Sequence, residues 1–181
     1  MSRIPLIGRA AAAGPVREAF ERKIAERGNI PNMYRAFAHR PWLLSTMDAH
    51  FAAVLGSGTV PLKLKEMLAL QTSQCNESRY CSASHTILAR KTGSSPEQIA
   101  RLQDFERGPF TDKEKAALRF GLQMTREPTR VSDAVFAELR RHFDEGEIVE
   151  IAAVVGLFNY FNRFNEALRM EPTKPGEGVD S

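Results

Sequence analysis

Helical periodicity along almost the whole chain is the feature that most constrains the fold. Apolar side chains recur every three or four residues in successive segments, and no alternating segment is bounded as a strand would be. The run "IAAVVGLF" has the composition of a buried strand, but Phe158, Phe161 and Leu168 continue it among polar residues at helical spacing. The sequence therefore predicts an all-α protein.

Start and stop signals divide the periodic region into helices. Pro15 opens the first segment and Gly28 closes it, while Pro41 separates the next two. Thr111 followed by Glu114 has the spacing of a capping box. The expected helical segments are residues 15–28, 30–40, 41–58, 60–75, 79–93, 94–105, 111–126, 132–143 and 144–170.

The length of 181 residues predicts one domain with short flanking segments. We expect an N-terminal segment over 1–14, a single helical domain over 15–170, and a disordered tail over 171–181, where proline and glycine are frequent. The motif "KEMLAL" from Lys65 is echoed by "KEKAAL" from Lys113, and each opens a helix. This echo suggests a degenerate helical repeat.

The composition excludes several classes of protein. The net charge of +3 is small and the basic residues are interspersed with acids, so nucleic-acid binding is not expected. No stretch approaches the roughly 18 apolar residues of a membrane span, and two cysteines make no disulfide framework. A cytoplasmic, reducing compartment is the expectation, and a nearby pair of cysteines there is typical of catalysis or metal binding.

The segment "SQCNESRYCSASH", from Ser73 to His85, contains both cysteines. Cys81 and His85 are four residues apart, which puts them one turn apart on one face of a helix. An imidazole there can accept the thiol proton or stabilise the thiolate, which is the nucleophilic form. Ser78 is placed to cap this helix, so that first-turn amides would also favour an anion at Cys81. Both effects predict a lowered thiol pKa.

Glu66 lies in the preceding helix, and the break at "NES" is expected to fold the two helices back on each other. If Glu66 reaches His85, the carboxylate orients the imidazole, and the imidazole accepts the proton of the Cys81 thiol. Spacing alone does not decide whether Glu66 reaches His85. Glu66 could instead be a solvated acid paired with Lys63 or Lys65. Cys81 could equally be a buried thiol beside a satisfied histidine.

A zinc site is a further alternative, because Cys75, Cys81, His85 and Glu66 could supply four ligands. The spacing of the two cysteines is wider than that of usual zinc motifs, and the other histidines are scattered. No metal and no cofactor is therefore expected.

The spacing and its flanks also carry a family resemblance. Glu66 is followed after eleven residues by "SRYC", which ends at Cys81, and after three more residues by His85. Within "SQCNESRYC", Tyr80 and Cys81 complete a wider pattern. With the flanking "GNIPNMYRAFAHRPWLL", "TDKEKAALRF" and "FDEGEIVEIAAVVGLFNYFNRFNEAL", the chain resembles the carboxymuconolactone decarboxylase and alkylhydroperoxidase D-like family, in its peroxidase-related branch.

The resemblance implies an alkylhydroperoxidase D-like helical fold that assembles into trimers, hexamers or similar homo-oligomers. It implies that Cys81 attacks a peroxide, that Glu66 and His85 relay protons, and that Tyr80 belongs to the site motif. The closing helix of the family packs near its site, so Asn162 and Arg163 could line the pocket.

One departure from the family pattern matters for activity. Ser78 stands where the first cysteine of the pair belongs, and a serine cannot form the disulfide. A sulfenic acid at Cys81 would then need another thiol, either Cys75, which lies six residues earlier, or an external reductant. Whether Cys75 can reach is left open by the sequence.

Two functions follow from this pattern. The first is an antioxidant, thiol-dependent peroxidase that acts on a hydroperoxide and draws on an external thiol. The alternative is a non-redox, decarboxylase-like or small-ligand-binding oligomer whose dithiol has decayed, and a purely structural helical oligomer is a third option.

Overall fold

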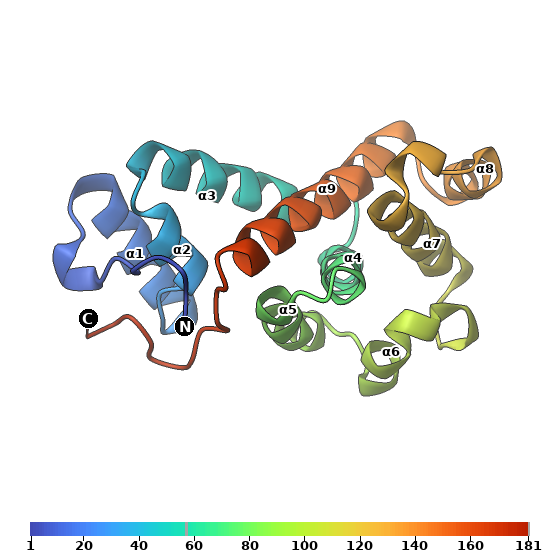
Figure 1. Ribbon diagram of the computed structural model, residues 1–181. Helices are drawn as coiled ribbons and strands as arrows, with labels where there is room; N and C mark the ends of the chain where they lie inside the picture. Colours follow the sequence, from blue (N-terminus) through green and yellow to red (C-terminus); the bar gives the residue numbers. More distant parts are fainter. Residues whose placement is uncertain (57, 181) are drawn as a thin grey trace.

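The computed structural model describes residues 1–56 and 58–180 (Figure 1). Across these residues the chain forms α-helices and short 3-10 helices and no strand, so the all-α prediction is confirmed. The α-helices are α1 (Gly14–Arg27), α2 (Asn32–Phe37), α3 (Pro41–Leu55), α4 (Leu62–Cys75), α5 (Arg79–Lys91), α6 (Pro96–Arg101), α7 (Asp112–Arg126), α8 (Asp133–His142) and α9 (Glu145–Ala167). The 3-10 helices are η1 (Arg9–Ala11), η2 (Leu102–Arg107) and η3 (Pro128–Arg130).

Local capping explains where several helices begin. Capping boxes, in which the cap and third-residue side chains bond reciprocally to backbone N–H groups, join Ser95 with Gln98, Thr111 with Glu114, and Asp144 with Glu147. The predicted box at Thr111 is therefore confirmed. Such a cap satisfies backbone donors that the first helical turn leaves free.

Helix α4 lies at the centre and packs against α5, α7 and α9. Figure 1 shows α1 and α2 with both chain termini on one side, α5 to α8 on the other, and the long α9 crossing between them. Helix α3 packs on α1, α2 and α9 and so ties the N-terminal part to the rest. None of the helices in the described residues has the length and apolar content that a bilayer-spanning segment requires.

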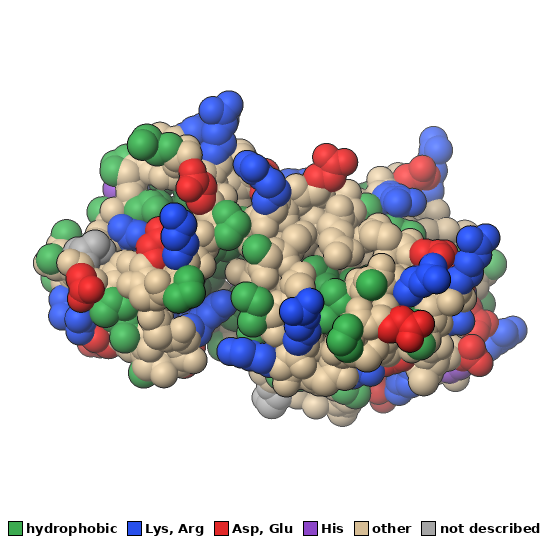
Figure 2. Space-filling model, turned by 90° about the horizontal axis from the view of Figure 1, so that it is seen from below, with side chains coloured by type: hydrophobic (Ala, Val, Ile, Leu, Met, Phe, Trp, Pro, Cys, Tyr) green, Lys and Arg blue, Asp and Glu red, His purple; other side chains and the backbone are tan. Residues whose placement is uncertain are grey.

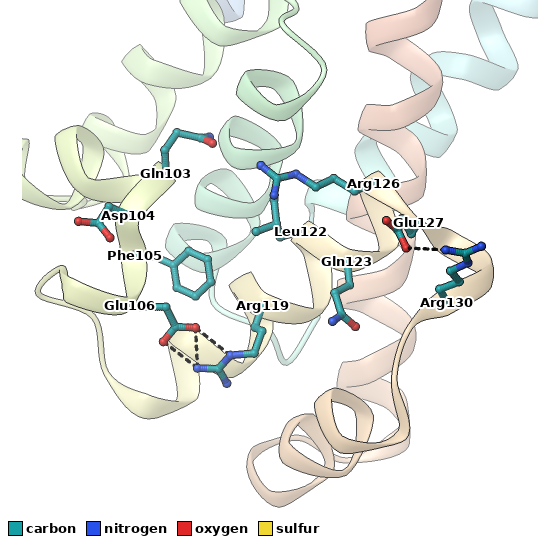
Figure 3. Close-up of a pocket in the computed structure, with 10 residues that line it drawn as sticks. All are labelled: Gln103, Asp104, Phe105, Glu106, Arg119, Leu122, Gln123, Arg126, Glu127 and Arg130. Atoms are coloured by element: carbon teal, nitrogen blue, oxygen red, sulfur yellow. Dashed lines mark hydrogen bonds and ion pairs between the residues drawn. The ribbon is translucent and has the colours of Figure 1, made fainter.

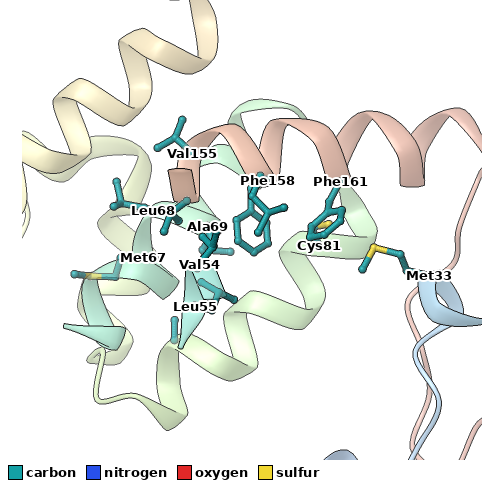
Figure 4. Packing of buried hydrophobic residues seen from close by; sticks show 14 of the residues in the cluster. Met33, Val54, Leu55, Met67, Leu68, Ala69, Cys81, Val155, Phe158 and Phe161 are labelled. Atoms are coloured by element: carbon teal, nitrogen blue, oxygen red, sulfur yellow. The ribbon is translucent and has the colours of Figure 1, made fainter. Parts of the chain in front are cut away.

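Helix α9 carries the aromatic stripe that organises the core. Phe158 and Phe161 are buried with their rings edge to face, 6.0 Å apart between centroids, and each contributes about 2 kcal/mol by burial. Figure 4 shows both rings beside Cys81 of α5, with Met33 of α2 at the N-terminal side. The core thus places the sulfur of Cys81 where α2, α5 and α9 meet.

The two echoing motifs begin two helices that pack together, α4 and α7. Nζ of Lys65 lies 2.9 Å from the Glu150 carboxylate, and Nζ of Lys113 lies 3.4 Å from that of Glu147. Both lysines thus form ion pairs with glutamates in the first two turns of α9. A duplicated origin of the two motifs stays a prediction.

The segment after α9, expected to be disordered, runs back along the N-terminal part. Thr173 Oγ1 accepts a hydrogen bond from the backbone N–H of Asn32, and the Glu177 carbonyl accepts one from Ile30. Gly178 has a φ of 83°, and a Cβ there would lie 3.1 Å from the Cβ of Ile30. Glycine at that point therefore lets the chain pass close to Ile30. Residues 1–14 also make contacts, including a bond from the N–H of Arg3 to the carbonyl of Leu168.

Candidate functional site

The turn between α4 and α5 brings the acid and the histidine together. The N–H of Ser78 donates to the carbonyl of Ser73 at 2.8 Å, and Glu77 takes a positive φ of 55°, which reverses the chain. Because α5 then runs antiparallel to α4, Glu66 faces His85. Their side chains meet at 2.6 Å between Oε2 and Nδ1.

Both members of this pair are buried, with 4% of Glu66 and 5% of His85 exposed. The contact is made through Nδ1, so the carboxylate orients the imidazole and Nε2 lies on the opposite side of the ring. Phe158 packs edge-on against the imidazole at 4.4 Å between centroids. Lys63 and Lys65 pair with other carboxylates, so Glu66 is not the solvated lysine partner that the sequence allowed.

Cys81 is the third residue of α5 and only 3% exposed. Burial raises the pKa of its thiol, and hydrogen bonds from the side chains of Asn165, Ser78 and Asn162 act in the opposite direction without cancelling it. The expectation of a thiol ionised near neutrality is therefore wrong for the resting site. Removal of the sulfur from water outweighs the hydrogen bonds that these three side chains make to it.

Ser78 occupies the N-cap position of α5, as predicted, but its side chain caps no helical N–H. Its hydroxyl donates instead to Oε1 of Glu166 in α9, at 3.0 Å. This charge-assisted hydrogen bond directs the side chain toward α9, so that its oxygen accepts no hydrogen bond from an N–H at the helix start. Position 78 thus joins α5 to α9.

A buried amide network lies behind the thiol. Nδ2 of Asn162 donates to the hydroxyl of Ser73 at 3.1 Å, and its Oδ1 accepts from Asn76 at 2.9 Å. Asn162 therefore braces the α4–α5 turn rather than lining the cavities described below. Arg163 is exposed on the outer face of α9 and donates to Asn159 at 2.7 Å, so it also lies away from those cavities.

Tyr80 ties the site to the N-terminal part and to the C-terminal segment. Its hydroxyl accepts from the backbone N–H of Met33 at 3.2 Å and lies 3.4 Å from Oγ1 of Thr173. Burial raises the pKa of Tyr80, so the phenol is neutral at physiological pH. Cys75 ends α4 as a half-buried free thiol, and Cys81 is also free.

Two cavities meet at the candidate site. A small one of about 30 Å³, enough for a water molecule, is lined by Cys81 and His85 together with aromatic side chains. A larger cleft of about 570 Å³ shares six lining residues with it and reaches the surface between α1 and α5. The shared residues are Arg27, Pro31, Tyr34, Phe51, Tyr80 and Ser84. Figure 2 shows the molecule hollowed between its N-terminal part and the rest, with apolar and basic side chains at the rim.

Another cavity, of about 450 Å³, lies between η2 and the C-terminal end of α7 (Figure 3). Its charged groups largely neutralise one another, because Arg119 pairs with Glu106 at 2.7 Å and Arg130 pairs with Glu127 at 3.9 Å. No cysteine or histidine is among its lining residues. Cys81 and His85 both line the small cavity that adjoins the cleft between α1 and α5.

Three residues near the thiol were not predicted from the sequence to belong to the site. Asn165 had a visible signal, since asparagines recur at steps of three along α9. No sequence pattern indicated Met33 or Arg27, because they belong to α2 and α1 and approach Cys81 only through tertiary packing. Among the described residues, no group of three or more His, Cys, Asp or Glu side chains could hold a metal ion.

Comparisons with known proteins identify the family of the chain. A sequence model of the carboxymuconolactone decarboxylase family matches residues 41–123, a span that contains Glu66, Cys81 and His85. The uncharacterized protein YdfG of Bacillus subtilis (strain 168) is 31% identical over 106 residues, which are 58% of this chain and 72% of that protein. The chain belongs to the carboxymuconolactone decarboxylase family.

Solved structures extend the similarity over nearly the whole chain. An alkylhydroperoxidase AhpD core, the uncharacterized peroxidase-related protein from Ralstonia eutropha JMP134, is 26% identical with a TM-score of 0.88, covering 96% of this chain and 93% of that one. The debrominase Bmp8, in complex with 2,3,4-tribromopyrrole, has the same fold at 22% identity with a TM-score of 0.84, covering 97% and 96%. The predicted alkylhydroperoxidase D-like fold is confirmed, and family and neighbours support an enzyme-like protein of this type.

Proposed function

We propose that this family member is a thiol-dependent peroxidase with Cys81 as its nucleophile. The observation that carries the proposal is the buried contact of 2.6 Å between Glu66 and His85, next to a cavity that His85 and Cys81 line together. A carboxylate-oriented imidazole beside a thiol is the arrangement that activates a cysteine nucleophile. The peroxidase-related neighbour is consistent with this chemistry.

The reaction begins with a neutral thiol, because burial raises the pKa of Cys81. Nε2 of His85 accepts the thiol proton as the sulfur attacks the distal oxygen of a hydroperoxide, ROOH. An S–O bond forms while the O–O bond breaks, and the departing alkoxide takes the proton from His85 and leaves as the alcohol, ROH. The peroxide is reduced, and Cys81 is oxidised to a sulfenic acid.

The return to the thiol proceeds without Ser78, whose hydroxyl cannot form a disulfide. Two equivalents of an external thiol reduce the sulfenic acid: the first forms a mixed disulfide with Cys81 and releases water, and the second releases the oxidised reductant as its disulfide. The large cleft beside Cys81 gives such a thiol a route to the sulfur.

The proposal is tested by titration with hydrogen peroxide, read by intact mass on the parent, Cys75→Ser and Cys81→Ser. The expected result is a gain of one oxygen atom on the parent and on Cys75→Ser, reversed by a small thiol, and no gain on Cys81→Ser. A loss of two hydrogen atoms on the parent, absent from Cys75→Ser, would assign Cys75 as resolving thiol instead. Unchanged mass in the parent at millimolar peroxide would overturn the proposal.

A non-redox role is a second candidate, favoured by two specific observations. The thiol pKa is raised by burial, and Cys81 is only 3% exposed. A protein of this kind would bind a small ligand in the cleft with Cys81 inert. Peroxide consumption that depends on Cys81 would exclude it.

We also propose that the chain assembles with copies of itself, as the family resemblance implies. Trp42, Val149 and Tyr160 are large apolar side chains that are mostly exposed in the single chain. Light scattering coupled to size exclusion measures the assembly, and a mass of one chain across micromolar concentrations would contradict it.

A further inference from the structure

The cleft beside Cys81 contains an arginine that has no anionic partner. Arg27, the last residue of α1, lines both the small cavity and the large cleft. Its side chain makes no hydrogen bond or ion pair with any residue that the structure describes. Tyr80 and Cys81 line the small cavity together with Arg27.

Other charges around the cleft are already engaged. Lys23 pairs with Glu26 at 2.8 Å and with Asp48 at 3.4 Å, so neither the lysine nor the acids are available to a ligand. Glu66 is held by His85. Lys91 is exposed and its side chain has no partner among the described residues, but it lines only the large cleft and not the inner cavity. Arg27 is therefore the cation that a bound molecule meets beside the thiol.

The walls around Arg27 are apolar and aromatic. Phe51, Phe158 and Phe161 line the inner cavity, while Leu55 and Ile87 line the outer cleft. Arg27 is exposed to solvent, and its guanidinium can bind the carboxylate of a ligand in the cleft through two charge-assisted hydrogen bonds. A molecule that satisfies both features has a compact apolar body and one carboxylate.

We propose that the substrate of this site is a small carboxylate-bearing hydroperoxide, with its carboxylate on Arg27 and its peroxide group at Cys81. This inference rests on the proposed peroxidase function for the reaction, but the recognition of the carboxylate stands apart from it. Because Arg27 lines both the large cleft and the small cavity at Cys81, the body of the substrate lies in the cleft while its peroxide group reaches into the small cavity, and a compact body such as one aromatic ring fits the cleft volume of about 570 Å³.

Binding of unreactive analogues tests the recognition. Cuminate and cuminamide have the same isopropylphenyl body and differ in charge, and calorimetry measures their affinity for the parent, Arg27→Gln and Arg90→Gln. Arg90 is the matched control, because it is exposed on α5 and outside both cavities. The expected result is that the parent and Arg90→Gln prefer cuminate by about tenfold or more, and that Arg27→Gln loses this preference. Equal affinities in the parent, an unchanged preference in Arg27→Gln, or no binding of cuminate overturns the inference.

The reaction is tested with cumene hydroperoxide and its para-carboxylate derivative, with a small thiol as reductant. The parent and Arg90→Gln are expected to favour the carboxylate derivative over cumene hydroperoxide in kcat/KM by about tenfold or more, and Arg27→Gln is expected to lose most of this preference. If the parent turns over both hydroperoxides equally well, the recognition of a carboxylate is overturned and the proposed peroxidase function remains. A preference for cuminate without any turnover overturns the peroxidase and leaves the recognition of carboxylates in place.

Discussion

The side-chain amide of Asn165 donates a hydrogen bond to the sulfur of Cys81, with 3.3 Å between Nδ2 and Sγ. Asn165 is fully buried in α9, and its Nδ2 also lies 3.6 Å from the sulfur of Met33. A hydrogen bond from a neutral donor stabilises the thiolate more than the thiol. Among the hydrogen bonds that oppose the effect of burial on the thiol pKa, that from Asn165 is the largest.

Replacing Asn165 by leucine is expected to raise the pKa of Cys81 further, because the thiolate loses its donor while the burial remains. The measurement is the pH dependence of alkylation by iodoacetamide in a Cys75→Ser background, where Cys81 is the remaining thiol. Asn159→Ala is the control, since Asn159 bonds to Asn76 and not to the sulfur. A pH profile unchanged by the leucine would show that Asn165 does not influence the thiolate.

Replacing His85 by glutamine removes the base and is expected to lower kcat/KM for hydroperoxides by about 100-fold to 10,000-fold. Glu66→Gln keeps a hydrogen bond to Nδ1 but loses the charge, so a smaller loss and a shifted pH–rate profile are expected. Circular dichroism and thermal unfolding check that both variants fold. If His85→Gln retained the parent rate in a folded protein, the imidazole would have no role in the chemistry.

The ion pair between Lys65 and Glu150 predicts an acid-sensitive contribution to stability. Burial by itself would raise the pKa of Glu150, but the bonds from Lys65 and from the backbone N–H groups of Thr59 and Val60 outweigh it and lower the pKa to about 2. Since the folded-state pKa lies below the ordinary value of 4.5, the contribution is present above about pH 4.5 and is lost as the pH falls toward 2.

Urea unfolding of the parent and of Glu150→Gln across this pH range measures the effect. The variant is expected to be less stable at neutral pH, and the gap between the two proteins is expected to close on acidification. Glu145→Gln is the control, because Glu145 pairs only at the surface with Arg140. A gap that stays constant down to pH 2 would contradict the assignment.

Thr173→Val tests whether the C-terminal segment holds the cleft wall in place. Its hydroxyl accepts from the N–H of Asn32 and contacts the hydroxyl of Tyr80, and the loss is expected to cost about 1 kcal/mol in the free energy of unfolding. Hydrogen exchange is expected to speed up at residues 171–180 and at the start of α2. Thr129→Val, at an exposed position in η3, is the control. Equal exchange in both variants would mean that the segment is held by other contacts.

The helices and most of their starts could be predicted because their causes are local. Periodic apolar residues, the prolines at 15 and 41 and the capping box at Thr111 act within a few residues of each other, and the structure forms helices at these places. Ser78 shows the limit of this logic. Its position at the start of α5 was predictable, but a glutamate of α9, 88 residues away in sequence, takes the hydroxyl that a local argument assigned to the cap.

The sequence by itself determined an all-helical protein with Glu66, Cys81 and His85 at a spacing that can act together. Only the tertiary structure decided that Glu66 does reach His85, that burial raises rather than lowers the pKa of the thiol, and that Arg27 stands unpaired in the same cleft. Helix formation depends on neighbours within one or two turns, whereas desolvation and charge pairing depend on helices that are distant in sequence. The chemistry of the sulfur is therefore set by α1, α2 and α9, which no spacing within its own segment could place.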